Sequence, residues 1–164
     1  MTEEIREEIL MNLEKNSRID LHELAIMLDV SEVDLANEIQ DMETEKIICG
    51  YTTLINWDNT GKEIVTALIE VKVTPQRNLG FDDFAKRVAG FPEVTSVYLM
   101  SGGFDFMVLI EGKSMKQVSK FVFNKLSTLD SVLSTATHFV LKKYKDHGVN
   151  LVDEKKDERE MGVN

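Results

Sequence analysis

Residues 94–112 read V-T-S-V-Y-L-M-S-G-G-F-D-F-M-V-L-I-E-G, and this stretch decides the fold. Two apolar runs, Val97–Met100 and Phe104–Ile110, flank Ser101-Gly102-Gly103. Consecutive glycines readily take the positive φ angles that a two-residue hairpin turn requires. The pattern therefore predicts a β-hairpin that turns at the two glycines.

The second strand of this hairpin is apolar on both faces. Phe106, Val108 and Ile110 alternate with Met107 and Leu109, whereas an antiparallel strand with one face in water alternates apolar and polar residues. Both faces of the sheet therefore need a cover. The neighbouring segments supply one, and a second copy of the chain is the simplest candidate for the other.

The segments around the hairpin alternate between strand and helix patterns. Residues 65–73 and 132–141 are strand-like, and amphipathic helix patterns begin at Phe81 and after Ser114. The resulting order β-α-β-β-α-β predicts a ferredoxin-like α+β domain over residues 62–145, with both helices on one sheet face.

Upstream of residue 56 the chain shows three short helix patterns. The first covers residues 3–15, and Asp20 and Ser31 are the expected N-caps of the second and third. A tight turn before the third helix predicts a helix-turn-helix, and an extended piece at Lys46–Tyr51 suggests its winged variant over residues 1–55. Residues 56–61 then form a linker, and residues 146–164 a charged tail.

Composition excludes several classes of function. The three histidines lack metal-ligand spacing, the single Cys49 is expected to be buried, and the Gly102-Gly103 pair lacks the Lys and Ser/Thr of a phosphate loop. We therefore predict no catalytic residue, metal or cofactor. The acidic N-terminus and the absence of an apolar run near about 18 residues predict a cytoplasmic protein without a membrane partner.

The charge is unevenly placed along the 164 residues. Residues 1–57 hold 4 Lys/Arg and 14 Asp/Glu, so the whole net charge of −10 lies in the N-terminal third. The expected third helix contributes strongly, because residues 31–45 contain six acidic residues and no Lys or Arg. That composition opposes DNA binding, since phosphate contacts need cations.

Two sets of residues carry a family resemblance. One set comprises Ile9-Leu10, Leu13, Arg18, Glu23-Leu24-Ala25, Ser31, Ile39, Met42-Glu43, Ile48 and Gly50-Tyr51; the other comprises the turn Met100–Asp105 and the strand segment Ser134–Thr137. In type and spacing these residues resemble the Lrp/AsnC (leucine-responsive/asparagine regulator, feast/famine) transcription factors. The resemblance covers residues 3–145.

The resemblance implies an amino acid or related effector near the turn, at the contact between dimers. The expected effector-binding residues are Ser101, Gly102, Gly103, Phe104, Asp105, Thr135 and Thr137. Asp105 suits the ligand's ammonium group, and backbone N–H groups of the turn suit its carboxylate. Alternatively, Asp105 only caps the turn and the threonines are ordinary strand residues. The family usually has a polar residue in place of Gly103 and Tyr in place of Phe104.

For DNA, the resemblance implies contacts from Arg18, Ser31, Asn37, Gln40 and Lys46. The family's third helix is usually basic, with Arg near the position of Glu38, so here only Asn37 and Gln40 suit base edges. Avidity in an oligomer is one remedy for weak binding. The alternatives are an acidic docking surface for a basic protein, or a helix face that has lost its original task.

These observations predict a DNA-binding transcriptional regulator that senses an amino acid or related metabolite. Its second domain is expected to dimerise through the open sheet face and to assemble into tetramers or octamers. The alternative is an effector-sensing oligomer that acts through protein contacts without DNA.

Overall fold

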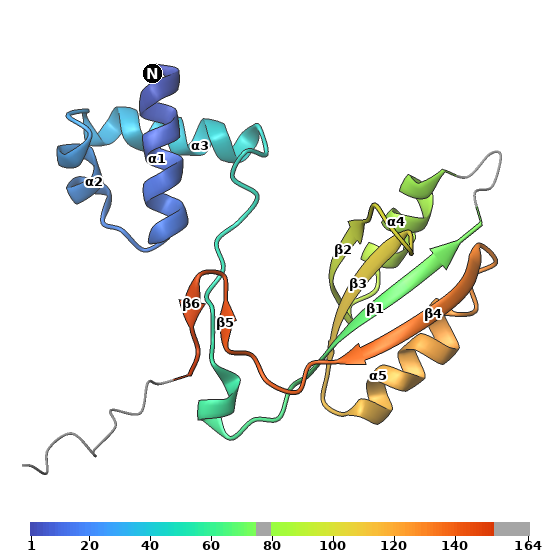
Figure 1. Ribbon diagram of the computed structural model, residues 1–164. Coiled ribbons are helices and arrows are strands. Elements are labelled where there is room, and N and C mark those ends of the chain that lie inside the picture. Colours follow the sequence, from blue (N-terminus) through green and yellow to red (C-terminus); the bar gives the residue numbers. More distant parts are fainter. Residues whose placement is uncertain (75–79, 153–164) are drawn as a thin grey trace, which may run out of the picture. The chain divides into compact units, whose positions relative to one another are not determined.

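The computed structural model describes residues 1–74 and 80–152, and the chain divides into two compact units, Met1–Leu54 and Ile55–Asn164 (Figure 1). The first unit contains the helices α1 (Glu3–Lys15), α2 (Leu21–Met27) and α3 (Glu32–Thr44). One residue or more from each helix forms its core: Ile9, Leu24, Ala25, Leu35 and Met42. This unit has the helix-turn-helix that the sequence predicts.

The helix starts follow from local capping. The Asp20 carboxylate accepts hydrogen bonds from the N–H groups of His22 and Glu23 at 3.0 and 3.1 Å. The Ser31 hydroxyl accepts from the N–H of Asp34 at 3.0 Å. Each cap satisfies donors that the first helical turn leaves without an intrahelical partner. The two predicted N-caps are therefore confirmed.

The strand expected at Lys46–Tyr51 does not form. The N–H groups of Ile47 and Ile48 both donate to the carbonyl of Met42, at 2.9 and 3.1 Å, and so close the C-terminal end of α3. Donors engaged in this way are not available for a strand ladder. The helix-turn-helix of the described residues therefore lacks the paired strand of a wing.

Cys49 also departs from expectation. Its side chain is exposed, and its thiol donates to the carbonyl of Lys46 at 3.1 Å. The prediction of burial was wrong because Cys49 lies in this surface turn and not in a strand.

The second unit begins with a short 3-10 helix, η1 (Trp57–Thr60), in the predicted linker and continues into a ferredoxin-like fold. Its elements are β1 (Val65–Val73), α4 (Phe81–Ala89), β2 (Val94–Leu99), β3 (Phe106–Gly112), α5 (Met115–Phe121), the π-helical turn η2 (Val122–Leu126) and β4 (Val132–Phe139). The antiparallel sheet has the order β2-β3-β1-β4. The predicted α+β class and βαββαβ order are confirmed.

A small hairpin follows this fold within the segment that was expected to be a charged tail. Its strands are β5 (Lys145–Asp146) and β6 (Val149–Asn150). The side-chain amide of Asn56 donates to the carbonyl of Leu151 at 2.9 Å, which ties this segment to the start of the unit. The remainder of the predicted tail, residues 153–164, lies outside the described residues.

Both long helices cover the same face of the sheet (Figure 1). Alternate residues of β1 and β3 point into this core, where they meet side chains from α4, α5 and η2: Ala67, Ile69, Val71, Val73, Phe106, Val108, Ile110, Phe84, Val88, Val118, Phe121, Val122 and Leu126. The opposite face carries Leu68 paired with Leu109, and Glu70 paired with Met107. These four side chains are only partly buried in the single chain.

The hairpin turn is longer than predicted. Leu99 pairs with Phe106, so Met100–Asp105 form a six-residue loop in place of a two-residue turn. Of the two glycines, Gly102 has a left-handed φ of 141°, and Gly103 does not have a positive φ. A two-residue type I′ turn at the glycines would require both to have positive φ, and the pairing of Leu99 with Phe106 leaves six residues in the loop.

Candidate effector site and DNA-binding surface

The β2–β3 loop is fixed to the end of β1 by Asp105. The backbone N–H of Asp105 donates to the carbonyl of Val71 at 3.0 Å, and its Oδ2 accepts from the N–H of Val73 at 2.8 Å. The N–H of Met100 closes the loop on the carbonyl of Asp105 at 2.8 Å. Asp105 therefore has a structural role, while an ionised carboxylate retains further sites for a ligand donor.

The tip of this loop is open to solvent. Ser101, Gly102 and Gly103 are exposed, whereas Phe104 is half-buried. A Cβ atom added to either glycine would meet no other atom within 4 Å. The backbone of the loop is therefore accessible to a ligand.

The two threonines lie on β4, on the other side of β1. Val71 pairs with Phe106 on one side and with Thr135 on the other, and Ile69 pairs with Thr137. Two strand spacings of about 4.8 Å therefore separate the β3 and β4 backbones. The Oγ1 of Thr135 lies 3.4 Å from the Oγ of Ser127. The loop and Thr135 share one end of the sheet, and Thr137 lies farther along β4.

A cavity of about 280 Å³ lies at the same end of the sheet. Its charged lining residues are Asp83 and Arg87 of α4 and Asp130 before β4, and its apolar residues are Val73, Phe81, Phe84 and Leu129. The cavity reaches the loop through two contacts: Asp105 holds the N–H of Val73, and the ring centroids of Phe81 and Phe106 are 5.7 Å apart.

Sequence analysis missed this cavity. Its walls come from the end of β1, the start of α4 and the connection from η2 to β4, which are far apart in the chain. The one local signal is the i, i+4 spacing of Asp83 and Arg87, which places both side chains on one side of α4.

The outward ridge of α3 is uncharged. Val33, Asn37, Gln40 and Thr44 recur at i, i+4, i+7 and i+11 and are all exposed, Val33 to 70%. Leu35 and Met42 lie fully buried on the opposite side of the helix. Asn37 and Gln40 therefore lie in the middle of the exposed side of α3, where the sequence predicts contact with base edges.

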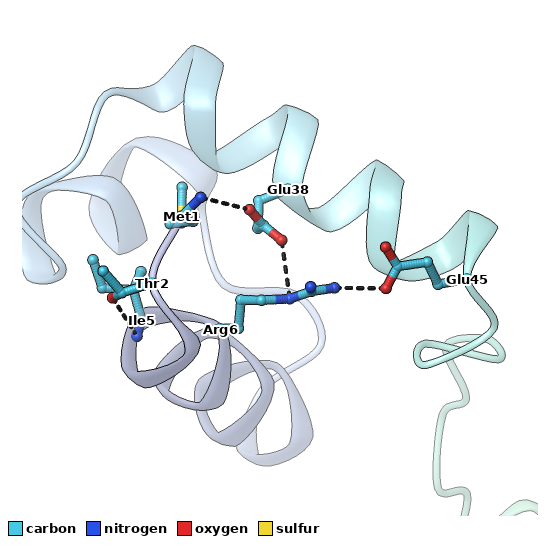
Figure 2. Close-up of polar contacts among 6 residues, drawn as sticks. All are labelled: Met1, Thr2, Ile5, Arg6, Glu38 and Glu45. Atoms are coloured by element: carbon cyan, nitrogen blue, oxygen red, sulfur yellow. Dashed lines mark hydrogen bonds and ion pairs between the residues drawn. The ribbon is translucent and has the colours of Figure 1, made fainter.

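Two of the acidic residues of α3 are neutralised by Arg6 of α1. Figure 2 shows the Arg6 guanidinium between Glu38 and Glu45, with Nε 3.0 Å from a Glu38 oxygen and Nη2 2.7 Å from a Glu45 oxygen. The amino group of Met1 lies 3.5 Å from Glu38. The hydrogen bond to Glu45 raises the pKa of Arg6 above its ordinary value. The Glu38 side chain is only 12% exposed, so it faces α1 and not the outward ridge.

Other acidic residues of α3 also have partners within the first unit. Asp34 accepts from the Ser31 hydroxyl at 2.6 Å, and Glu43 accepts from the Tyr51 hydroxyl at 2.7 Å. Burial, followed by the hydrogen bond to Glu43, raises the pKa of Tyr51. Glu32 lies 3.3 Å from His22. The hydroxyl donors carry no charge, so Asp34 and Glu43 keep theirs, and the exposed Asp41 has no ion-pair partner among the described residues. Only Glu38 and Glu45 are paired with a described lysine or arginine cation, which reduces but does not remove the negative charge around the outward ridge.

The remaining residues predicted to contact DNA occupy different positions. Ser31 is engaged as the cap of α3, while Arg18 and Lys46 are exposed and form no ion pair with a described residue. Lys46 follows the C-terminal end of α3 with a left-handed φ of 62°. The structure thus provides two exposed cations and two exposed amides from the predicted set.

Residues 1–74 and 80–152 contain neither a metal-ligand cluster nor a membrane-spanning helix. No group of three or more His, Cys, Asp or Glu side chains in these ranges is arranged to hold a metal ion. No helix in them is long and apolar enough to cross a membrane.

Comparisons with known proteins agree with both units. The model of the Lrp/AsnC ligand binding domain matches residues 66–149. The HTH-type transcriptional regulator YugG of Bacillus subtilis is 52% identical over 142 residues, which cover 86% of each chain. A proline dehydrogenase transcriptional activator of Rhodobacter capsulatus is 30% identical and covers 82% of this chain and 86% of its own length.

Among solved structures, the transcriptional regulator NMB0573 of Neisseria meningitidis, in complex with L-Met, is similar over 89% of this chain and 94% of its own. The TM-score is 0.70 and the sequence identity 25%. The similarity therefore extends over the helix-turn-helix and the ferredoxin-like fold together. The protein described above belongs to the Lrp/AsnC family of transcriptional regulators.

Proposed function

We propose that this regulator binds an amino acid with an apolar side chain at the loop end of its sheet, and that the ligand alters its occupancy of DNA. The cavity beside the β2–β3 loop carries this proposal. It combines both signs of charge, from Arg87, Asp83 and Asp130, with an apolar wall. A zwitterion with an apolar side chain needs these three elements.

The size of the cavity supports a small ligand. Its 280 Å³ lies just below the range of about 300–1,000 Å³ that is typical of sites for drug-sized molecules. Arg87 suits a carboxylate, Asp130 suits an ammonium group, and Phe81 and Phe84 suit an apolar side chain. The exposed backbone of Ser101–Gly103 lies in the loop that Asp105 ties to Val73 of the cavity wall, and we expect it to supply further polar groups to the ligand.

Asp105 allows binding and folding to be tested separately. Asp105→Asn keeps an oxygen that accepts from the Val73 N–H but removes the negative charge, whereas Asp105→Ala removes both. Isothermal titration calorimetry with a panel of amino acids should detect a ligand for the wild type. We expect weaker binding by Asp105→Asn and by Arg87→Ala, and unchanged binding by the control Lys86→Ala.

Absence of binding heat from every apolar amino acid would contradict the proposal. Equal binding by the wild type and Asp105→Asn would show that Asp105 only holds the loop. In that case Asp105 only caps the turn, which is the alternative that the sequence leaves open. Ligand binding by Arg87→Ala would then be the remaining test of the cavity.

DNA recognition is assigned to the outward ridge of α3. Asn and Gln side chains pair with the N6 and N7 atoms of adenine, so Asn37 and Gln40 favour sites with adenine at the contacted positions. Arg18 and Lys46 would contact phosphates. One relative is an HTH-type transcriptional regulator and the other a transcriptional activator, which favours this assignment over an oligomer that acts without DNA.

The test is a titration of the chain's own upstream DNA by fluorescence anisotropy, in parallel with unrelated DNA. Loss of a bidentate base contact costs about 1–3 kcal/mol. We therefore expect Asn37→Ala and Gln40→Ala to lose preference for the upstream DNA but to keep binding to unrelated DNA. Asn59→Ala, in η1, is the matched control. Equal discrimination by wild type and both variants would exclude the ridge as the reader of bases.

Assembly is the third part of the proposal. The open sheet face carries Leu68, Met107 and Leu109 beside Tyr98, which is 52% exposed. A second copy would cover this face and give a homodimer, and further contacts would give a tetramer or octamer. An oligomer presents several helix-turn-helix units to one DNA molecule, which raises the affinity of weak single contacts.

A further inference from the structure

The segment from Gly112 to Leu129 is basic and contains no acidic residue. It reads G-K-S-M-K-Q-V-S-K-F-V-F-N-K-L-S-T-L, covers α5 and η2, and carries four lysines. The neighbouring segments are mixed in charge, and residues 58–164 as a whole have no net charge. An uninterrupted block of positive charge in such a background indicates a surface for an anionic partner.

Three of the four lysines lie together on the solvent side. Lys116 and Lys120 lie one turn apart, at i and i+4, on the exposed side of α5, and Lys113 precedes the Ser114 N-cap of the helix. All three are exposed and form no ion pair with a described residue. Val118 and Phe121 are buried against the sheet on the other side of α5. These three lysines are named the α5 basic face.

The fourth lysine is different. Nζ of Lys125 lies 2.6 Å from a Glu93 oxygen, and it lies 5.5 and 5.7 Å from the ring centroids of Phe91 and Phe121. This ion pair lowers the pKa of Glu93. Lys125 therefore has a structural partner, which the α5 basic face lacks.

An exposed aromatic residue lies in the same segment. Val122 and Leu126, four residues apart, are buried on the sheet side of η2. Phe123 lies off that side and is 77% exposed.

The first unit has few cations for contacts with DNA phosphates. Of its four basic residues, Arg6 is engaged by Glu38 and Glu45, which leaves Lys15, Arg18 and Lys46. DNA affinity depends on the number of phosphates that a protein neutralises. Three further lysines in each copy would double the available cations.

We propose that the α5 basic face is a second DNA-contacting surface, which binds phosphates without reading sequence. The inference rests on the proposed DNA binding through α3 and adds a separate surface to it. Lysine suits this role because its ammonium group binds phosphate as a point charge from a flexible stem. The surface would supply affinity, and Asn37 and Gln40 would supply discrimination.

The test compares the triple variant Lys113→Gln, Lys116→Gln, Lys120→Gln with the charge-matched control Lys62→Gln, Lys86→Gln, Lys145→Gln. Affinity for the upstream DNA and for unrelated DNA is measured by anisotropy at several salt concentrations. The slope of log affinity against log salt should fall by about 0.9 for each lysine that meets a phosphate. Both DNAs should lose affinity by the same factor, and the control should keep the wild-type slope.

Acetylation footprinting gives a second readout on the unmodified protein. DNA should protect Lys113, Lys116 and Lys120 from an amine-reactive acetylating reagent and leave Lys86 reactive, as measured by mass spectrometry. This measurement does not depend on how the substitutions affect assembly. Unchanged reactivity of the three lysines at saturating DNA would overturn the inference.

The outcomes separate the two proposals. A wild-type protein that binds no DNA at low salt overturns the proposed DNA binding as a whole. If the wild type binds DNA and the triple variant keeps the wild-type salt slope, only the proposal of a second DNA-contacting surface is overturned. An acidic protein segment then becomes the partner to test for the α5 basic face. Phe123→Ala should leave the slope unchanged, because phosphate contacts need only the lysines.

Discussion

Glu38 shows how a single residue can be misread from sequence. Its place in α3, between Asn37 and Gln40, suggests an exposed negative charge on the surface that meets DNA. In the structure it turns toward α1 and pairs with Arg6 at 3.0 Å. A helical wheel does not reveal this pairing, because the partner is 32 positions away and its own exposure depends on how α1 packs. Arg6 therefore positions α3 and removes charge from the vicinity of the ridge.

We expect Arg6→Ala to weaken DNA binding several-fold, although Arg6 itself need not touch DNA. The substitution leaves Glu38 and Glu45 without their cation, and unpaired negative charge near the DNA surface lowers the association rate. Stopped-flow anisotropy at two salt concentrations measures this rate. Arg6→Lys keeps the charge and is the control; equal association by Arg6→Ala and the wild type would argue against a role of the pair.

At the scale of elements, α3 depends on its cap. Ser31 is among the residues that the family resemblance assigns to DNA, and its hydroxyl is engaged with both the N–H and the carboxylate of Asp34. Its contribution to the structure can therefore be measured apart from DNA.

Ser31→Ala should lower the free energy of unfolding of the first unit by about 1 kcal/mol, the usual cost of losing an N-cap. Urea denaturation followed by circular dichroism measures the change, and Ser31→Thr, which retains a capping hydroxyl, is the control. Unchanged stability of Ser31→Ala would mean that the cap is dispensable.

The pair of Lys125 in η2 and Glu93 before β2 predicts a pH dependence. Because the pKa of Glu93 is lowered from its ordinary value of 4.5, the pair stabilises the fold above that pH and loses its effect as the pH falls below it. Glu93→Gln should therefore cost about 0.5–1 kcal/mol at neutral pH. The difference from the wild type should vanish in acid, as measured by urea denaturation at both pH values. A difference that persists in acid would assign the effect to packing.

Regular elements were predictable from the sequence, and connections were not. The strand at 65–73 and the helix starts at Asp20 and Ser31 follow from periodicity and capping chemistry, which are local. The six-residue loop Met100–Asp105 depends on the bond from Asp105 to Val73, a contact 32 positions away in sequence. The cavity depends in the same way on three separate connections. The spacing of residues within one segment carries no information on contacts between segments that are far apart in the sequence.

At the scale of the whole molecule, the open sheet face is the feature behind the proposed assembly. Alternation in β3 places Met107 and Leu109 on this face, and neither helix of the unit covers it. The sequence predicts this surplus of apolar residues directly, since the second strand of the hairpin has no polar side. It does not predict the number of copies, which depends on the contacts between dimers.

Leu109→Glu should convert the protein to monomers, because a charge would be buried at the centre of the dimer contact. Light scattering after gel filtration measures the mass. Ala89→Glu, on the exposed side of α4, is the control and should keep the wild-type mass. A wild type that is already monomeric at micromolar concentration would contradict the assembly.

The two hydrophobic cores share no residue: one consists of helices only, and the other of a sheet with its two helices. Mutations that repack one core therefore impose no packing demand on the other. If the proposed division of roles holds, DNA recognition and effector binding are free to diverge separately during evolution. A chimera that joins residues 1–54 of a paralogue to residues 55–164 of this chain should then bind the paralogue's DNA sites and keep the effector preference of this chain.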